Sequence, residues 1–208
     1  MQPPRDLGKI QAYFAEKLKT HGATPAGVDY NSLEAQEIRF GQLLKLIDAR
    51  QPYALLDYGS GFGSLFDFLR RLGHDLVYYG YDLSPEMVAR GRELHLNEPV
   101  CHFTTRWAEV PQVDYALSCG TFNLKMDFDE AAWTALVLDG LQQMDQRARQ
   151  GFAFNLLTKY SEVEKMRPHL YYGDPLFFFD YCKRHFSKNV ALLHDYQLYD
   201  FTILVRKD

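Results

Sequence analysis

Glycines that directly follow a short apolar segment constrain this chain more than any other feature of its sequence. The segment Ala54–Tyr58 is apolar apart from Asp57, and glycine then occupies positions 59, 61 and 63. A short apolar run beside glycines predicts a buried strand, here one that ends near a carboxylate. Alternate glycines predict a loop whose backbone a ligand can approach closely, because no side chain stands in the way. The apolar spacing over 64–72 predicts that a helix follows.

The loop departs from the pattern that binds dinucleotides. That pattern is Gly-x-Gly-x-x-Gly, with the pyrophosphate at a helix N-terminus, whereas position 64 here is Ser. The carboxylate of Asp57 would repel a pyrophosphate but attract an ammonium group. A second strand, Val77–Tyr81, ends at Asp82 about 20 residues after the loop, where an acid accepts hydrogen bonds from ribose hydroxyls. A nicotinamide-dependent dehydrogenase is therefore a less favoured alternative.

The glycine loop and the two acids resemble the class I S-adenosylmethionine-dependent methyltransferases. The first motif of that family reads acid-x-Gly-x-Gly-x-Gly and the second is an acid that closes the next strand. Asp57–Gly63 and Asp82 fit both motifs, and the similarity continues through Leu83–Met87 and, more weakly, from about Tyr53 to the C-terminus. The resemblance implies S-adenosylmethionine as cofactor and S-adenosylhomocysteine as its product.

The resemblance also implies which residues bind the cofactor. Asp57 is expected near the methionine amino group and Asp82 at both ribose hydroxyls. Leu83 and Met87 are expected to flank adenine, although core packing explains Met87 equally well. The full expected set is Arg39, Asp57, Gly59, Ser60, Gly61, Gly63, Asp82, Leu83, Met87, Trp107, Gly120 and Phe122.

Four members of this set lie outside the two motifs and the segment Leu83–Met87: Arg39, Trp107, Gly120 and Phe122. Gly120 and Phe122 are expected to line the methyl-donor pocket. Trp107 stands near the position where many family members carry an acid that binds the adenine amino group. Either Trp107 stacks on the purine or the backbone there reads the purine edge. Arg39 lies in an N-terminal helix of the kind that small methyltransferases place over the cofactor, where an arginine pairs with the methionine carboxylate. A solvated helix face is the alternative for Arg39.

Strand and helix patterns alternate from residue 53 onward, which predicts an α/β fold with a doubly wound sheet. The resemblance implies seven mostly parallel strands in the order 3-2-1-4-5-7-6, the last one antiparallel. The first fifty residues read as two helices, so we expect an N-terminal helical cap at 1–50 and one compact methyltransferase domain at 51–208. Ser84 with Pro85 predicts one helix start, and Asp127 with Glu130 predicts another.

Composition disfavours several classes of function. The 208-residue chain has a net charge of −4, which gives no field that would attract nucleic acid. No apolar stretch approaches the roughly 20 residues of a membrane helix, so no membrane partner is expected. The three cysteines are scattered and odd in number, which favours free thiols in the cytoplasm. No cluster has the spacing of a complete metal site, and we expect no metal.

The sequence identifies catalytic residues poorly, and the chemistry implied by the resemblance explains this. A sulfonium is already an activated leaving group, so direct displacement needs alignment and the exclusion of water more than a visible base. We expect a methyltransferase that acts on a small metabolite or sugar-like acceptor, with no catalytic residue assigned. A non-catalytic S-adenosylmethionine-binding or regulatory domain is the alternative, and a nucleic-acid methyltransferase is disfavoured. The candidates for the acceptor pocket are Asn123, Lys125, Tyr172 and His194.

Overall fold

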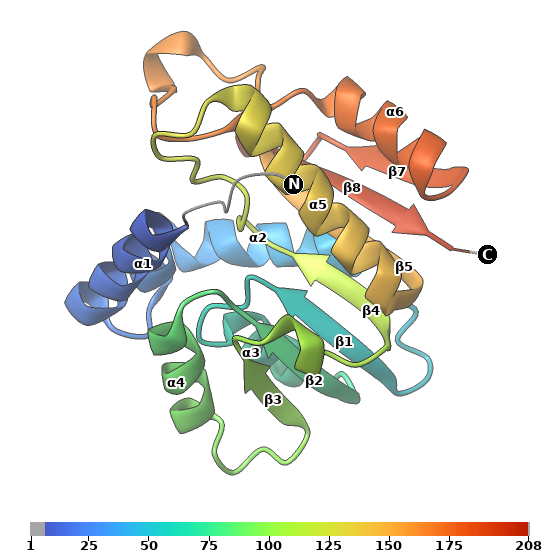
Figure 1. Ribbon diagram of the computed structural model, residues 1–208. Coiled ribbons are helices and arrows are strands. Elements are labelled where there is room, and N and C mark those ends of the chain that lie inside the picture. The colour runs from blue at the N-terminus through green and yellow to red at the C-terminus, as the bar shows by residue number, and fades with distance from the viewer. Residues whose placement is uncertain (1–6, 208) are drawn as a thin grey trace.

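The computed structural model describes residues 7–207, and its helices and strands alternate along the chain (Figure 1). The α-helices are α1 Gly8–His21, α2 Leu33–Leu44, α3 Ser64–Arg71, α4 Pro85–Leu94, α5 Glu130–Arg147 and α6 Pro175–His185. The strands are β1 Tyr53–Tyr58, β2 Leu76–Tyr81, β3 Cys101–Thr104, β4 Val113–Ser118, β5 Ala148–Thr158, β6 Tyr172–Gly173, β7 Asn189–Leu193 and β8 Asp200–Arg206. Short 3₁₀ turns lie at Pro25–Val28, Trp107–Glu109 and Val163–Lys165.

The strands form one twisted sheet in the order β3-β2-β1-β4-β5-β8-β7, and the two-residue β6 pairs with β5 outside this path. β8 runs antiparallel to both of its neighbours, whereas the pairs from β3 through β5 are parallel. If β6 is left out of the numbering, this order is the expected 3-2-1-4-5-7-6 with an antiparallel last strand. The predicted fold class is confirmed, with β6 as one added strand.

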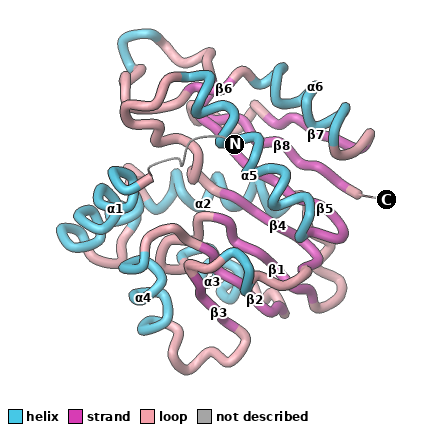
Figure 2. The backbone as a smooth tube through the Cα atoms, in the orientation of Figure 1, coloured by secondary structure: helices cyan, strands magenta, loops and turns pink. Residues whose placement is uncertain are grey.

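Helices cover both faces of the sheet (Figure 2). The neighbouring side chains of Leu55 and Leu56 in β1 point to opposite faces, as strand geometry requires. Leu55 joins a buried cluster with residues of α2, α3 and α4, including Phe40 and Leu65. Leu56 joins the cluster formed by α5 and α6. Both faces of the central strands are therefore buried, which is typical of a parallel sheet.

The N-termini of α4 and α5 show which of the predicted N-cap residues form caps. The Ser84 hydroxyl accepts a hydrogen bond from the Met87 N–H at 3.2 Å, so the predicted cap of α4 is confirmed. The prediction that Asp127 caps α5 is wrong, because Asp129 accepts the bond from the Ala132 N–H at 2.8 Å. Asp127 instead forms an ion pair with Lys9 in α1. An acid two residues closer to the helix therefore takes the role of cap.

Helix α1 lies beside the edge of the sheet where the parallel strands end, whereas α2 packs on one face of the sheet. In Figure 1 the arrowheads of β1 and β4 point toward the side where α1 lies. α1 is held to the segment after β2 by a hydrogen bond of 2.8 Å from the Gln11 side chain to the Leu83 carbonyl oxygen. Within residues 7–207, no helix has both the length and the apolar character needed to cross a bilayer.

Candidate functional site

A cavity of about 550 Å³ lies at the carboxyl ends of β1, β2 and β4, next to α1 and α2. Its volume is in the range of roughly 300–1,000 Å³ that is usual for sites that bind small molecules. Most of the residues expected to bind the cofactor line this cavity: Arg39, Asp57, Gly59, Ser60, Gly61, Asp82, Leu83, Met87, Gly120 and Phe122.

Asp57, near the end of β1, is the most deeply buried acid of the two motifs. Its side chain is 3% exposed, and the Tyr78 hydroxyl donates a hydrogen bond of 2.6 Å to it. Burial raises the pKa of Asp57 to about 7; the bond from Tyr78 opposes this shift and the nearby Asp82 adds to it. The carboxyl group therefore changes charge near neutral pH and gains from a cationic partner.

Asp82, the acid of the second motif, accepts a hydrogen bond from the glycine loop of the first motif. Its Oδ2 accepts a hydrogen bond from the Gly61 N–H and its Oδ1 accepts one from the Ser84 N–H, both at 2.8 Å. Burial raises the pKa of Asp82, and these backbone bonds oppose the shift. Each carboxylate oxygen has a second lone pair, so Asp82 can still accept hydrogen bonds from a ligand. The same side chain thus fixes the glycine loop and the start of α4.

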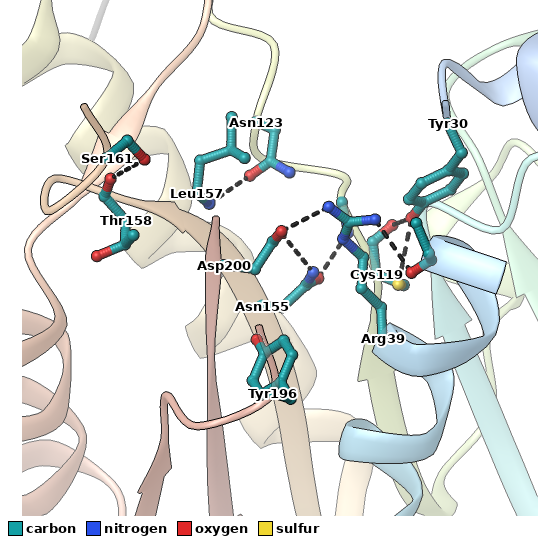
Figure 3. Close-up of polar contacts among 12 residues, drawn as sticks. Tyr30, Arg39, Cys119, Asn123, Asn155, Leu157, Thr158, Ser161, Tyr196 and Asp200 are labelled. Atoms are coloured by element: carbon teal, nitrogen blue, oxygen red, sulfur yellow. Dashed lines mark hydrogen bonds and ion pairs between the residues drawn. The ribbon is translucent and has the colours of Figure 1, made fainter. Parts of the chain in front are cut away.

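The residues that follow β4 also line the cavity, and the Tyr30 side chain contacts them (Figure 3). The Tyr30 hydroxyl donates to the Cys119 carbonyl oxygen at 3.0 Å. Gly120 has a φ of +70°, and a Cβ there would lie 2.6 Å from the Tyr30 hydroxyl, so this contact requires glycine. Burial raises the pKa of the Cys119 thiol to about 12, which keeps it neutral and unsuited to nucleophilic attack.

Arg39 is held by Asp200, the first residue of β8 (Figure 3). The guanidinium Nη2 lies 2.5 Å from Asp200 Oδ2, and the Asn155 side chain donates to Asp200 Oδ1 at 3.1 Å. The Oδ1 of Asn155 in turn accepts a bond of 2.7 Å from the Gly120 N–H. Arg39 Nε is buried and has no partner among the described residues. These bonds connect α2 to the loop after β4.

Two residues of the expected set do not line the cavity. Gly63 has a φ of +97°, and a Cβ there would lie 2.7 Å from the Phe103 ring, so it packs against β3. The Trp107 ring lies 5.8 Å from that of Tyr58 and 5.2 Å from that of Tyr81. Because Tyr58 and Tyr81 do line the cavity, Trp107 stands behind its wall.

Of the four acceptor-pocket candidates, Asn123 lines the cavity and the other three lie elsewhere. The Lys125 amine donates to the Phe128 carbonyl oxygen, and the Tyr172 hydroxyl accepts from the Arg167 N–H. The His194 ring packs against the aromatic rings of Tyr160 and Phe201. Lys125 and His194 belong to loops and Tyr172 belongs to the two-residue strand β6, and none of the three lines the cavity.

Sequence reasoning missed Tyr30, Asn155 and Asp200. None of them belongs to a motif, and each acts through a partner far away in the chain. Asp200 and Arg39 are separated by 161 positions, and Tyr30 and Cys119 by 89. The one available signal was that the acid Asp200 directly precedes an apolar run, which is also compatible with an ordinary turn.

Comparison with known proteins identifies the family. No family model matches the sequence. A Mycobacterium tuberculosis protein, Rv1506c, which bears the name of a methyltransferase, is 41% identical over 164 residues, covering 79% of this chain and 99% of that protein. This chain belongs to the class I S-adenosylmethionine-dependent methyltransferases.

Solved structures have the same fold as this methyltransferase at low sequence identity. Human N-acetylserotonin methyltransferase, solved with S-adenosylmethionine, superposes with a TM-score of 0.69 at 13% identity, covering 99% of this chain and 60% of that one. The 1,6-didemethyltoxoflavin-N1-methyltransferase of Burkholderia thailandensis gives a TM-score of 0.65 at 16% identity, covering 100% and 91%. Its structure holds 1,6-didemethyltoxoflavin and S-adenosylhomocysteine.

Proposed function

We propose that the cavity binds S-adenosylmethionine and that the protein transfers its methyl group to a nucleophile on a small-molecule acceptor. One observation carries the proposal: the glycine loop and both motif acids meet at the cavity, and the Gly61 N–H is bonded to Asp82. The small-molecule class is supported by the names of structural relatives that act on N-acetylserotonin and 1,6-didemethyltoxoflavin.

The residues present fit this donor. Asp57 offers a carboxylate to the ammonium group, and Asp82 keeps lone pairs for the ribose hydroxyls. Leu83 and Met87, which line the cavity, provide apolar contact for adenine. The buried Nε of Arg39 has no partner among the described residues, and a carboxylate from the ligand would supply one.

Trp107 and Gly63 were expected to contact the cofactor but do not line the cavity, and the proposal gives them supporting roles. Trp107 supports the adenine wall by fixing Tyr58 and Tyr81. Gly63 allows α3 to begin directly after the loop, because a left-handed conformation is easy for glycine.

When bound, S-adenosylmethionine supplies a methyl group on a positively charged sulfur that leaves readily. The protein's own residues then have to hold both molecules in line and keep water out. Alignment of this kind accounts for up to about 7–11 kcal/mol in favourable intramolecular models. We assign no residue as an acid or base, and the neutral Cys119 thiol takes no covalent part.

The proposal treats residues 1–50 as a cap over the methyltransferase unit 51–208. Tyr30 and Phe14 line the cavity from this segment. Phe40 and Leu43 of α2 belong to the same buried cluster as β1, so cap and unit share one core. Point substitutions are therefore better tests of the cap than a truncation, which would expose that core.

Calorimetry with the purified protein tests the donor. S-adenosylmethionine and S-adenosylhomocysteine are expected to bind, and NAD is not. Asp82→Ala should weaken donor binding by about 1.5–3 kcal/mol, because it removes a charged hydrogen-bond acceptor. Glu93→Ala, at an exposed position of α4, serves as the control and should change nothing. Tight NAD binding without binding of the methyl donor would reject the proposal; donor binding without turnover on any acceptor would favour the regulatory domain.

Donor affinity should depend on pH through Asp57. Because the pKa of Asp57 is raised to about 7 in the ligand-free protein, its carboxyl is largely protonated at lower pH and cannot pair with the donor's ammonium group. Raising the pH from about 6 to about 8 should therefore strengthen binding roughly tenfold, with release of a proton. Calorimetry in buffers of different ionisation enthalpy measures both quantities.

Variants provide the controls for this pH dependence. Asp57→Asn has no titrating group and should bind the donor with a flat profile. Tyr78→Phe removes the hydrogen bond that lowers the pKa of Asp57. In this variant the affinity for the donor should therefore rise at a higher pH than in the wild-type protein. Because the pKa of Asp57 is higher in the folded than in the unfolded protein, the protonated carboxyl group stabilises the ligand-free protein, and this contribution is lost as pH rises through about 7. A flat profile in the wild-type protein would contradict this role of Asp57.

A further inference from the structure

The part of the cavity beyond the motif residues is walled by the segments that follow β4 and β5. Leu124 and Leu170 pair across an isolated β-bridge. The Leu157 N–H donates to the Asn123 side chain at 3.1 Å, which joins the end of β5 to the same loop. Trp133 of α5 contacts this loop through the Phe122 carbonyl oxygen. The side chains that these segments, α5 and the end of β5 add to the cavity are mainly apolar. The apolar ones are Phe122, Leu124, Trp133, Leu136, Leu157 and Leu170, and the polar ones are Thr121, Asn123, Asp139 and Gln143.

The polar atoms of this wall are few and largely occupied. The Trp133 Nε1–H donates to the Phe122 carbonyl oxygen at 2.7 Å. Asn123 Oδ1 must face the Leu157 N–H, since that group is a donor, so the Nδ2 edge of Asn123 points the other way. The Thr121 hydroxyl donates to the Tyr58 carbonyl oxygen at 2.8 Å, and Gln143 Oε1 accepts from the Tyr58 hydroxyl at 3.4 Å. The wall therefore offers an incoming molecule mainly apolar surface and the neutral amide donors of Asn123 and Gln143, which are fewer partners than a polyhydroxylated ring needs.

The charges that line the cavity are mostly negative. Among residues 7–207, the acids of the lining are Asp29, Asp57, Asp82 and Asp139, and its one cation is Arg39. Arg39 is already paired with Asp200 at 2.5 Å, and under the proposed function its remaining Nε binds the carboxylate of the donor. Asp57 and Asp82 are held by a hydroxyl and by backbone N–H groups, which are neutral donors. The positive charge of the donor is thus matched by these two acids, and no further lining cation is present for an acceptor.

We propose that the acceptor is an uncharged, largely apolar molecule, and that acceptors whose phosphate or carboxylate enters the cavity are excluded. This inference rests on the proposed function and narrows its substrate class. An anionic group in this space would lose its hydration without gaining a cationic partner, which is strongly unfavourable. An apolar ring would instead gain contact with Leu124, Leu170 and Trp133.

Binding of probes in charge-matched pairs tests the inference in protein saturated with S-adenosylhomocysteine. The first pair is catechol and its carboxylated analogue protocatechuate; the second is methyl glucoside and glucose phosphate. Chemical-shift titration should rank catechol first, at least tenfold tighter than protocatechuate, with the glucoside weaker than catechol. Equal or tighter binding of an anionic probe, a glucoside that outranks catechol, or no binding of catechol at millimolar concentration would overturn the inference.

A single substitution tests the role of charge directly. Leu170→Lys places a cation on the half-buried wall and should reduce the preference for catechol over protocatechuate by about tenfold. Leu176→Lys, at a 61% exposed position of α6 outside the lining, is the matched control and should leave the preference unchanged. An unchanged preference in folded Leu170→Lys would contradict the inference. Failure of the protein to bind S-adenosylhomocysteine at all would reject the proposed function instead.

Discussion

Replacing Gly61 with leucine is expected to abolish measurable binding of S-adenosylmethionine. Gly61 has a φ of +55°, where a side chain costs about 1–2 kcal/mol, and a Cβ there would lie 2.9 Å from Val28 Cγ1. The residue also lines the cavity, and its N–H is fixed by Asp82. A leucine side chain would therefore strain the loop, disturb its contact with Asp82 and occupy space assigned to the donor. Calorimetry measures the loss.

Gly73 supplies a control with the same backbone cost. It has a φ of +80°, and a Cβ there would meet no atom within 4 Å. Gly73→Leu should lower stability through its backbone and leave donor affinity unchanged, whereas Gly61→Leu should lose affinity while its circular dichroism remains that of a folded protein. If Gly61→Leu binds the donor normally, or if both variants lose affinity equally, the glycine loop is not the donor's binding surface.

The sequence predicted the parts of the fold that depend on local pattern. Strands such as β1 and β2 are short apolar runs bounded by turn residues, and their identity depends little on distant contacts. The cap at Ser84 was predicted correctly because Ser followed by Pro satisfies the helix start by itself. Asp127 and Asp129 are both residue types that can form an N-cap. Asp127 pairs with Lys9 of α1, and Asp129 caps α5. The contact with Lys9 is not visible in the local sequence.

The motif acids and glycines other than Gly63 line one cavity, and the reason is topological. Parallel strands that are neighbours end at the same edge of a sheet, so acids at the ends of β1 and β2 must come close together. The acceptor candidates had no such constraint. Lys125 and His194 lie on loops and Tyr172 lies in the short strand β6 between loops, whose course depends on packing, and only Asn123 of the four lines the cavity. A pattern along the chain does not give the direction of a loop side chain.

Replacing Asp200 with alanine is expected to destabilise the protein by about 3–5 kcal/mol. The side chain of Asp200 is fully buried and that of Arg39 is 13% exposed, so the variant would leave an unpaired buried cation. It would also remove a hydrogen-bond partner of Asn155, which holds the Gly120 N–H. Burial alone would lower the pKa of Arg39, but the bond to Asp200 outweighs this and keeps the guanidinium charged. Urea unfolding measures the change in stability.

A second variant separates the loss of pairing from the loss of volume. If an unpaired charge is the main cost, the double variant Arg39→Leu with Asp200→Leu should be more stable than Asp200→Ala, because it contains no buried charge at this place. Asp180→Ala, in the exposed pair with Arg184 on α6, should change stability little because water screens that pair. A double variant less stable than the single one would show that the pair itself is required for folding. A loss below about 1 kcal/mol in Asp200→Ala would mean that Arg39 finds another partner or water, and that the link from α2 to β8 contributes little to the walls of the cavity.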